Sequence, residues 1–215
     1  KEVFIPNSVL GCSPASTSPA ITDLDDNNLI WRTPPSDALQ GQVLAQVATE
    51  DEGAETAATM YVNNAYGQAL SESFVSAFDG TVQSEVSFPK GASSYSSQLS
   101  QALSDDPDIV VVVGYPESGV QLFRDYYSGY DGSKPFLVTD GLQDSDLPSD
   151  VGNAMTNVGG SAPSAAGPGE EFFVTEYQNE YDAEPGVFTS QAFDATAVCL
   201  LANAAAGENS GPAIA

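Results

Sequence analysis

The sequence predicts an α/β protein built on an open, mostly parallel sheet. Between residue 36 and about residue 160, strand-like and helix-like patterns alternate, which is typical of strands joined by right-handed helical crossovers. The run Ile109–Val113 is apolar throughout, as expected for a strand covered on both faces of a parallel sheet. With 215 residues, 41% of them hydrophobic, the chain is long enough to bury one large core or two small ones.

The elements of this unit can be assigned in order. A first helix is predicted from Ser36, a residue type favoured at helix N-caps, to Ala48. Its apolar side chains recur at helical spacing, and we expect five of them to face the core: Leu39, Val43, Leu44, Val47 and Ala48. The later patterns predict strands at 56–63, 81–88, 108–114 and 135–141, and helices at 66–80, 95–104 and 117–130.

Two stretches rich in breaker residues, 32–37 and 159–169, bracket this unit. Two further helices are predicted beyond the second stretch, at 169–181 and 190–206. These helices need a sheet to cover, but only the segment around 3–13 is strand-like outside the bracketed unit. Either they pack on the same sheet or the chain is part of something larger.

The charge is strongly acidic. Thirty Asp and Glu residues face five Lys and Arg residues, for a formal net charge of −25. Five scattered cations cannot neutralise a row of phosphates, so we exclude nucleic acid as a partner. An acidic, lysine-poor globular composition resembles that of proteins from salt-adapted archaea, in which salt screens the self-repulsion. The absence of histidine removes the commonest general base and the commonest metal ligand.

The chain has two cysteines, Cys12 and Cys199, and their spacing cannot decide between one disulfide and two thiols. We expect free, buried thiols. The residues Val9–Cys12 fit a lipoprotein processing box, but the preceding segment lacks the apolar core of a signal peptide, so we interpret the match as chance. The longest apolar runs are shorter than the roughly 20 residues that a membrane span needs.

Neither a metal nor a cofactor is expected. The segment 23–28 begins like a calcium loop, but it lacks glycine at the sixth position and has Pro34 at the twelfth. The segment 167–172 misses the third glycine of the dinucleotide-binding fingerprint and has no strand of its own before it. Both segments are interpreted as solvated turns or linkers.

Polar and aromatic residues follow three of the predicted strands. Ligands of open α/β sheets bind beyond the carboxyl ends of the strands, so we expect these residues to share one rim. They offer hydrogen bonds, aromatic faces and a carboxylate for a cation, which is the chemistry of recognition, and no activated nucleophile. The residues are Asn63, Asn64, Tyr66, Tyr115, Glu117 and Asp140.

Several segments taken in order resemble one family, the extracellular solute-binding proteins of branched-chain-amino-acid ABC transporters, which have the type I periplasmic-binding fold. These segments are SPASTSPAIT, WRTPPSDALQGQVLA, MYVNNAYGQAL, DIVVVVGYPESG, PFLVTDGL, and the long stretch from EEFFVTEYQNEY to AVCLLA. The resemblance implies two three-layer α/β/α lobes with parallel-core sheets, joined by hinge strands and closing over a ligand.

The resemblance also implies a binding site. Ala15 and Thr17 match the first-lobe loop that grips the amino-acid backbone, with the Ala15 carbonyl and the Thr17 hydroxyl toward the ammonium and the Thr17 amide toward the carboxylate. Tyr66 and Tyr115 match the second-lobe aromatics that cover the ligand. Asp140 matches the acidic residue that pairs with the ammonium.

The sequence lacks the initial βα units of the family and its C-terminal strands, so we interpret it as a fragment with lobe one incomplete. Residues 1–35 are expected to form part of lobe one, with the pocket loop and hinge entry. Residues 36–160 are expected to form lobe two, and 161–215 the return to lobe one with two helices. Exposed apolar faces on lobe one then predict a homodimer or contacts with residues outside this sequence.

Three classes of function come into question for this sequence. The first is an extracellular, cell-surface binding protein, membrane-anchored at full length, that delivers a small aliphatic amino acid to an ABC permease. The second is a ligand-sensing receptor domain or an amide- or urea-binding protein of the same fold. The third, an enzyme, is disfavoured because no acid–base pair or nucleophile is visible. Side-chain specificity depends on pocket residues outside this sequence.

The acidity predicts dependence on salt. Dialysis from molar KCl into low salt should unmask repulsion among the carboxylates, and the helical circular-dichroism signal should be lost. An undiminished spectrum and unchanged melting temperature at low salt would show that the charge is not a salt adaptation.

Overall fold

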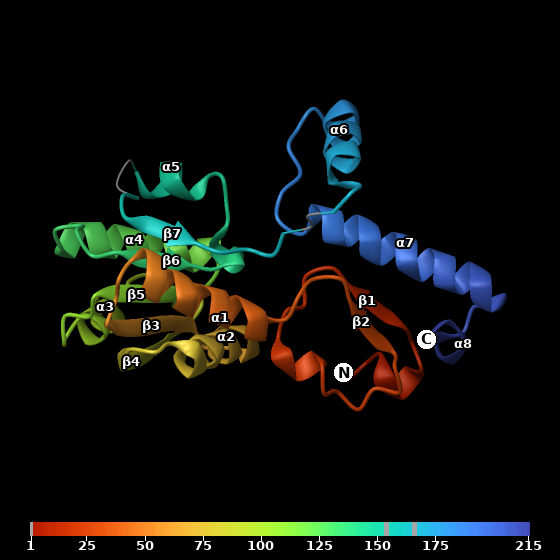
Figure 1. The fold of residues 1–215 in the computed structure, drawn as a ribbon, viewed down its shortest axis with the longest axis horizontal. Coiled ribbons are helices and arrows are strands. Elements are labelled where there is room, and N and C mark those ends of the chain that lie inside the picture. Colours follow the sequence, from red (N-terminus) through yellow and green to blue (C-terminus); the bar gives the residue numbers. More distant parts are fainter. Residues whose placement is uncertain (1, 153–154, 165–166) are drawn as a thin grey trace. The chain divides into compact units, whose positions relative to one another are not determined.

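The computed structural model describes residues 2–152, 155–164 and 167–215 (Figure 1). The chain divides into two compact units. Unit 1 is formed by two separate segments, Lys1–Ser36 and Pro163–Ala215, and unit 2 by the continuous segment Asp37–Ala162.

Unit 2 is built on a five-stranded sheet in the order β4-β3-β5-β6-β7. Every strand pair in it is parallel, and β5 lies at its centre, paired with β3 on one side and β6 on the other. All five side chains of β5 are fully buried, which confirms the interpretation of the apolar run as a central strand. The strands are β3 (Thr56–Val62), β4 (Thr81–Phe88), β5 (Ile109–Val113), β6 (Phe136–Val138) and β7 (Val158–Gly160).

Helices cover both faces of this sheet, which makes unit 2 a three-layer α/β/α structure (Figure 1). Alternate residues of β5 point to opposite faces: Val110 and Val112 belong to one core, and Val111 and Val113 to the other. The first core is closed by α3 (Ser96–Ala102), α4 (Pro116–Gly129) and α5 (Leu147–Val151). The second is closed by α1 (Asp37–Gln46), which continues into the π-helical turn η3 (Val47–Asp51), and by α2 (Ala65–Ala77).

The predicted inner face of α1 was partly wrong. Leu44 and Ala48 are fully buried, and Val47 packs against the core, but Leu39 and Val43 are exposed. Beside Leu44 and Ala48, the buried face contains polar and small residues that an apolar pattern does not count, namely Asp37, Gln40, Gly41 and Ala45. The helix is therefore rotated toward the side on which Gly41 allows close packing.

The second breaker-rich stretch, 159–169, contains an element that its composition did not predict. Gly159 and Gly160 belong to the edge strand β7, paired with Leu137 and Val138 of β6. A Cβ atom at Gly160 would collide with the carbonyl oxygen of Val138, so glycine permits the pairing here instead of ending it. Residues 165 and 166 of the predicted stretch lie outside the described residues.

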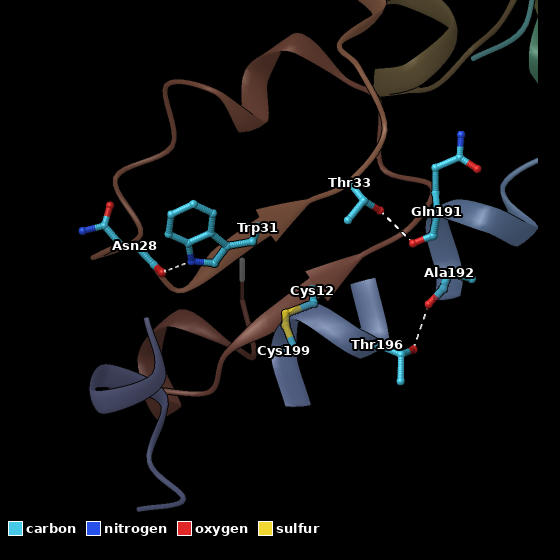
Figure 2. Close-up of a disulfide and its surroundings, with 8 residues drawn as sticks. All are labelled: Cys12, Asn28, Trp31, Thr33, Gln191, Ala192, Thr196 and Cys199. Atoms are coloured by element: carbon cyan, nitrogen blue, oxygen red, sulfur yellow. Dashed lines mark hydrogen bonds between the residues drawn. A yellow bond between two sulfur atoms is a disulfide. The ribbon is translucent and has the colours of Figure 1, made fainter. Parts of the chain in front are cut away.

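Unit 1 contains a small parallel pair of strands, β1 (Gly11–Ser13) and β2 (Ile30–Arg32), with Cys12 opposite Trp31. Its helical elements are η1 (Ile5–Asn7), η2 (Pro19–Ile21), α6 (Glu170–Tyr181), α7 (Thr189–Ala206) and α8 (Gly211–Ile214). A disulfide between Cys12 and Cys199 joins β1 to α7 (Figure 2), so the expectation of free thiols was wrong. The two residues are 187 positions apart with Cα atoms 6.7 Å apart, a proximity that only the folded chain creates.

The long helix α7 leaves several large apolar side chains in solvent. Phe193, Val198, Leu200 and Leu201 are each at least 60% exposed. The prediction that the C-terminal helices lack a sheet to cover agrees with this surface, and the predicted homodimer stays a prediction. Among the residues that the structure describes, no helix combines the length and apolar character of a membrane span.

Gly41 gives a test of the α1–α2 packing. A Cβ atom at Gly41 would lie 2.5 Å from the Cβ of Ser73 on α2 and 2.7 Å from the amide nitrogen of Phe74. We expect Gly41→Ala to lower the free energy of unfolding by about 1–3 kcal/mol in urea denaturation, because the helices must separate. The control is Gly129→Ala, a helical site with no atom within 4 Å of the added Cβ, which should change it by less than about 1 kcal/mol. Equal effects at the two sites would contradict this account.

Candidate functional site

Three of the predicted site residues lie together at the carboxyl edge of the unit 2 sheet. Each follows a different parallel strand: Tyr66 in the first turn of α2 after β3, Tyr115 at the N-cap of α4 after β5, and Asp140 after β6. The N-cap of α2 is Asn64, whose side chain accepts a hydrogen bond from the Gly67 amide at 2.8 Å. Strand direction and helix capping thus place the three side chains, as the carboxyl-end rule predicts.

The Tyr66 hydroxyl is the centre of this group. It donates to Oδ1 of Asp140 at 3.2 Å, lies 2.9 Å from the Thr139 hydroxyl and accepts the Gly141 amide at 3.3 Å. A hydroxyl carries only one proton. Since Tyr66 donates its proton to Asp140, the Thr139 hydroxyl is the donor in the contact between Thr139 and Tyr66. The network fixes the carboxylate against the start of α2.

Close backbone packing brings these groups together. A Cβ atom at Gly141 would collide with the carbonyl oxygen of Gly114 and lie 2.8 Å from the Tyr66 hydroxyl oxygen. Only glycine therefore allows the segments after β5 and β6 to approach this closely while Tyr66 remains hydrogen-bonded to Asp140.

Tyr115 and its neighbours form the rim. Its ring stacks on that of Tyr66 with centroids 5.5 Å apart, and its hydroxyl accepts a hydrogen bond from the Asn64 amide at 3.4 Å. Lys90 lies over the Tyr115 ring, 5.1 Å from the centroid, and pairs with Glu117 at 2.6 Å. The predicted rim residue Asn63 is exposed, and its backbone amide donates to the carbonyl of Phe88.

Asp140 is a buried acid. The residue is only 5% exposed. Burial raises the pKa of its carboxyl, while hydrogen bonds attributed to Gln40 and Tyr66 lower this pKa by a smaller amount. Burial and the nearby Asp140 charge also raise the pKa of the Tyr66 hydroxyl, which therefore stays protonated as a donor.

No cation of the described chain pairs with Asp140. Lys90 pairs with Glu117, Lys134 pairs with Asp106 at 2.8 Å, and the Arg124 guanidinium donates to the Asp150 carbonyl. Arg32 belongs to unit 1 and binds backbone carbonyls there. A buried carboxylate without a resident cation is suited to bind a cationic group that comes from outside.

The other two predicted site residues, Ala15 and Thr17, lie in unit 1, in the loop that follows β1. Thr17 is buried and Ala15 is exposed. The loop is folded around Ser13, whose hydroxyl accepts the amide hydrogens of Ala15 and Ser16 at 3.4 and 3.0 Å and donates to the Ser16 hydroxyl at 2.6 Å. This turn explains why hydroxyl residues cluster in the segment. The contacts that the resemblance assigns to Ala15 and Thr17 stay a prediction.

Arg32 is a functional candidate that the sequence analysis missed. From the end of β2 its guanidinium donates to the carbonyls of Ser16, Thr17 and Ser18 at 3.4, 2.9 and 2.7 Å, and to the Thr22 hydroxyl at 2.7 Å. These bonds hold the loop that carries Thr17, since the planar guanidinium presents several donors in a fixed geometry. The one available signal was an arginine at a strand end in a chain with only five cations.

Within residues 2–152, 155–164 and 167–215, no three His, Cys, Asp or Glu side chains are grouped as a metal site would require. Unit 2 by itself offers one carboxylate, two stacked tyrosines and hydrogen-bonding groups, and unit 1 by itself contains a folded hydroxyl-rich loop. Such groups can recognise a small polar ligand.

Comparison with known proteins gives a family. A family model described as "Periplasmic binding protein" matches residues 6–215. The chemotactic signal transduction system substrate-binding protein BasB of Halobacterium salinarum is 27% identical over 208 residues, which cover 94% of this chain and 49% of that protein. The chain thus spans about half the length of this curated relative.

Solved structures show the same fold. The leucine-binding protein LivK from Thermotoga maritima superposes with a TM-score of 0.87 and 27% identity, covering 99% of this chain and 62% of that one. LivJ from Streptococcus pneumoniae, in complex with isoleucine, gives a TM-score of 0.81 and 20% identity, covering 96% of this chain and 60% of that one. A solute-binding protein from Rhodopseudomonas palustris in complex with benzoate gives a TM-score of 0.81 and 18% identity, covering 99% of this chain and 61% of that one.

The raised pKa of Asp140 predicts how the unliganded protein responds to pH. The folded state binds this proton more tightly than the unfolded chain, so the stabilising contribution is complete below the unfolded pKa of about 3.9 and is lost as pH rises through the raised value. Relative to wild type, Asp140→Asn should therefore gain free energy of unfolding as pH rises from 4 to 7, measured by urea denaturation in molar KCl.

The control for this measurement is Asp108→Asn. The pKa of Asp108 is lowered, chiefly by a hydrogen bond from the Thr56 hydroxyl, so this carboxylate stabilises the fold above its unfolded pKa. Asp108→Asn should thus be less stable than wild type by a nearly constant amount from pH 4 to pH 7, because this range lies above the unfolded pKa. A gain in stability relative to wild type across this range, as expected for Asp140→Asn, would contradict the assigned environments.

Proposed function

The chain belongs to the periplasmic binding protein family, and on that premise we propose that it is part of an extracellular solute-binding protein that captures a small aliphatic amino acid. The single observation that carries this proposal is Asp140, a residue only 5% exposed whose carboxylate has no cationic partner among the described residues. An α-ammonium group would compensate this buried charge at short range.

The same carboxylate argues against an anionic ligand. Benzoate is the ligand printed for one neighbour of this fold, but its carboxylate would meet the Asp140 charge inside a buried site. Like charges there cost several kcal/mol. An amino acid avoids this cost if its ammonium faces Asp140 and its carboxylate faces elsewhere. The name of the leucine-binding neighbour supports an aliphatic side chain for the ligand.

We assign the remaining roles by following the family resemblance. Tyr66 and Tyr115 present stacked rings that cover an aliphatic body, and Tyr66 also holds Asp140 through its hydroxyl. Ala15 and Thr17 supply the carbonyl, hydroxyl and amide groups for the amino-acid backbone. Arg32 keeps the loop of these two residues folded through three carbonyls. Binding, not catalysis, is the proposed activity, since these groups include no activated nucleophile.

Two biological uses follow for the same site. Delivery to an ABC permease is the first, supported by the transporter proteins among the structural neighbours. The second is ligand sensing, supported by the name of the BasB relative, which belongs to a chemotactic signal transduction system. Both uses place the protein outside the cell. They share the capture step and differ in the partner that recognises the loaded protein.

Titration calorimetry tests the capture step. The full-length protein in molar KCl should release or absorb heat with leucine, isoleucine or valine, and Asp140→Asn should weaken that binding by at least about 100-fold, because it leaves the ligand ammonium unpaired. The control is Asp105→Asn, an exposed acid of the same unit, which should bind like wild type. Pools of short amides and urea are titrated in parallel. Heat from amides or urea alone, or unchanged affinity in Asp140→Asn, would contradict the amino-acid assignment.

A further inference from the structure

The disulfide of unit 1 lies beside the hydroxyl-rich loop. Cys12 is the middle residue of β1, and its partner Cys199 belongs to α7 (Figure 2). The residue after Cys12 is Ser13, whose hydroxyl accepts the amide hydrogens of Ala15 and Ser16 at 3.4 and 3.0 Å. The cross-link is therefore one residue away from the side chain that folds the loop.

The two residues that hold the loop lie opposite each other on the strand pair. In the parallel pairing of β1 with β2, Cys12 is opposite Trp31 and Ser13 is opposite Arg32. Ser13 holds the loop from its beginning, and Arg32 holds it through backbone carbonyls, among them that of Thr17 at 2.9 Å. The conformation of the loop therefore depends on how β1 is placed against β2.

The strand pair is too short to fix this placement by itself. Each strand has three residues, and β1 pairs only with β2 in the part of the chain that the structure describes. Isolated two-stranded pairs are marginally stable. The long helix α7 supports both strands: β1 is attached through Cys199, and Thr33, directly after β2, donates to the Gln191 carbonyl at 2.8 Å. Of these two attachments, the disulfide is the one that reaches β1.

We infer that the Cys12–Cys199 disulfide is a positioning cross-link for ligand capture. It keeps β1 on α7, so that Ser13 and Arg32 hold the loop in its binding conformation, and its reduction lowers the affinity for the amino acid. This inference rests on the proposed function, in which the loop supplies the groups for the amino-acid backbone. Hydrogen bonds to charged ligand groups are short and directional, so a small displacement of the loop weakens them.

Reduction of the disulfide is the perturbation that tests this role without changing the sequence. Both cysteines are partly exposed, so a small dithiol can reach the sulfur atoms. Dithiothreitol transfers two electrons: the S–S bond of the protein breaks, Cys12 and Cys199 become thiols, and the reagent becomes its cyclic disulfide. By linkage, if the intact disulfide raises ligand affinity by some factor, saturating ligand lowers the equilibrium constant for reduction by the same factor. A cross-link that only stabilised the fold would change neither quantity.

The experiment is leucine titration of the full-length protein in molar KCl, oxidised and reduced, at a temperature at which circular dichroism shows both forms folded. We expect the reduced form to bind leucine about 10-fold more weakly. Saturating leucine should lower the equilibrium constant for reduction by dithiothreitol by a similar factor, measured by trapping the Cys12 and Cys199 thiols and mass spectrometry. The matched control is the double variant Cys12→Ser with Cys199→Ser, which should bind like the reduced form and should not respond to dithiothreitol.

A double-mutant cycle tests whether the disulfide acts through the loop. Ser13→Ala removes the hydroxyl that folds the loop and keeps the disulfide. We expect it to weaken leucine binding about 10-fold in the oxidised protein. Reduction of this variant should then have less than about a threefold further effect, because the loop conformation is already lost. Equal effects of reduction in wild type and in Ser13→Ala would overturn the inferred route.

The outcomes separate the inference from the proposed function. Leucine binding by oxidised wild type with equal affinity after reduction would overturn the inference and leave the proposed function standing. Absence of leucine binding by oxidised wild type would overturn the proposed function and this inference with it. If the reduced protein does not fold, oxidised Ser13→Ala decides: unchanged leucine affinity there would show that capture does not need the loop conformation, and would overturn the inference.

Discussion

The parallel arrangement of the unit 2 sheet is the constraint on which the candidate site depends. Because β3, β5 and β6 run in the same direction, the residues that follow them meet at one edge, although Tyr66 and Asp140 are 74 positions apart. The sheet can be parallel because helices cover both faces, which in turn requires β5 to be apolar throughout. The hydrophobic core thus sets the place of the polar site.

Asp140 shows how the site conflicts with the stability of the empty protein. The carboxylate is buried, its pKa is raised, and it lacks a cation among the described residues, so the charged form is destabilising. The surrounding donors reduce this cost but do not remove it. Binding of a cationic group would remove this cost, and its affinity would then come partly from the relief of a cost that the fold already carries.

Periodicity and strand rules predicted most of unit 2 but not the contacts that complete the site. The run Ile109–Val113 and the residues after each strand were sufficient to place Tyr66, Tyr115 and Asp140 on one edge. The prediction that Leu39 and Val43 face the core was wrong, because the neighbouring helix decides which face of α1 is buried. Here α2 packs closely against Gly41. Arg32 could not be found by pattern, since its role depends on carbonyl groups that the fold brings within reach.

The disulfide was unpredictable for the same reason, and it bears on the loop of unit 1. Cys12 is adjacent to Ser13, which folds that loop, and the disulfide attaches it to α7 from the other segment of the unit. A second link is the hydrogen bond from the Thr33 hydroxyl to the Gln191 carbonyl at 2.8 Å (Figure 2). A cross-link of this kind is commonly worth about 2–5 kcal/mol, mainly by restricting the unfolded chain. Because unit 1 is made of two segments separated by all of unit 2, such links keep its segments together.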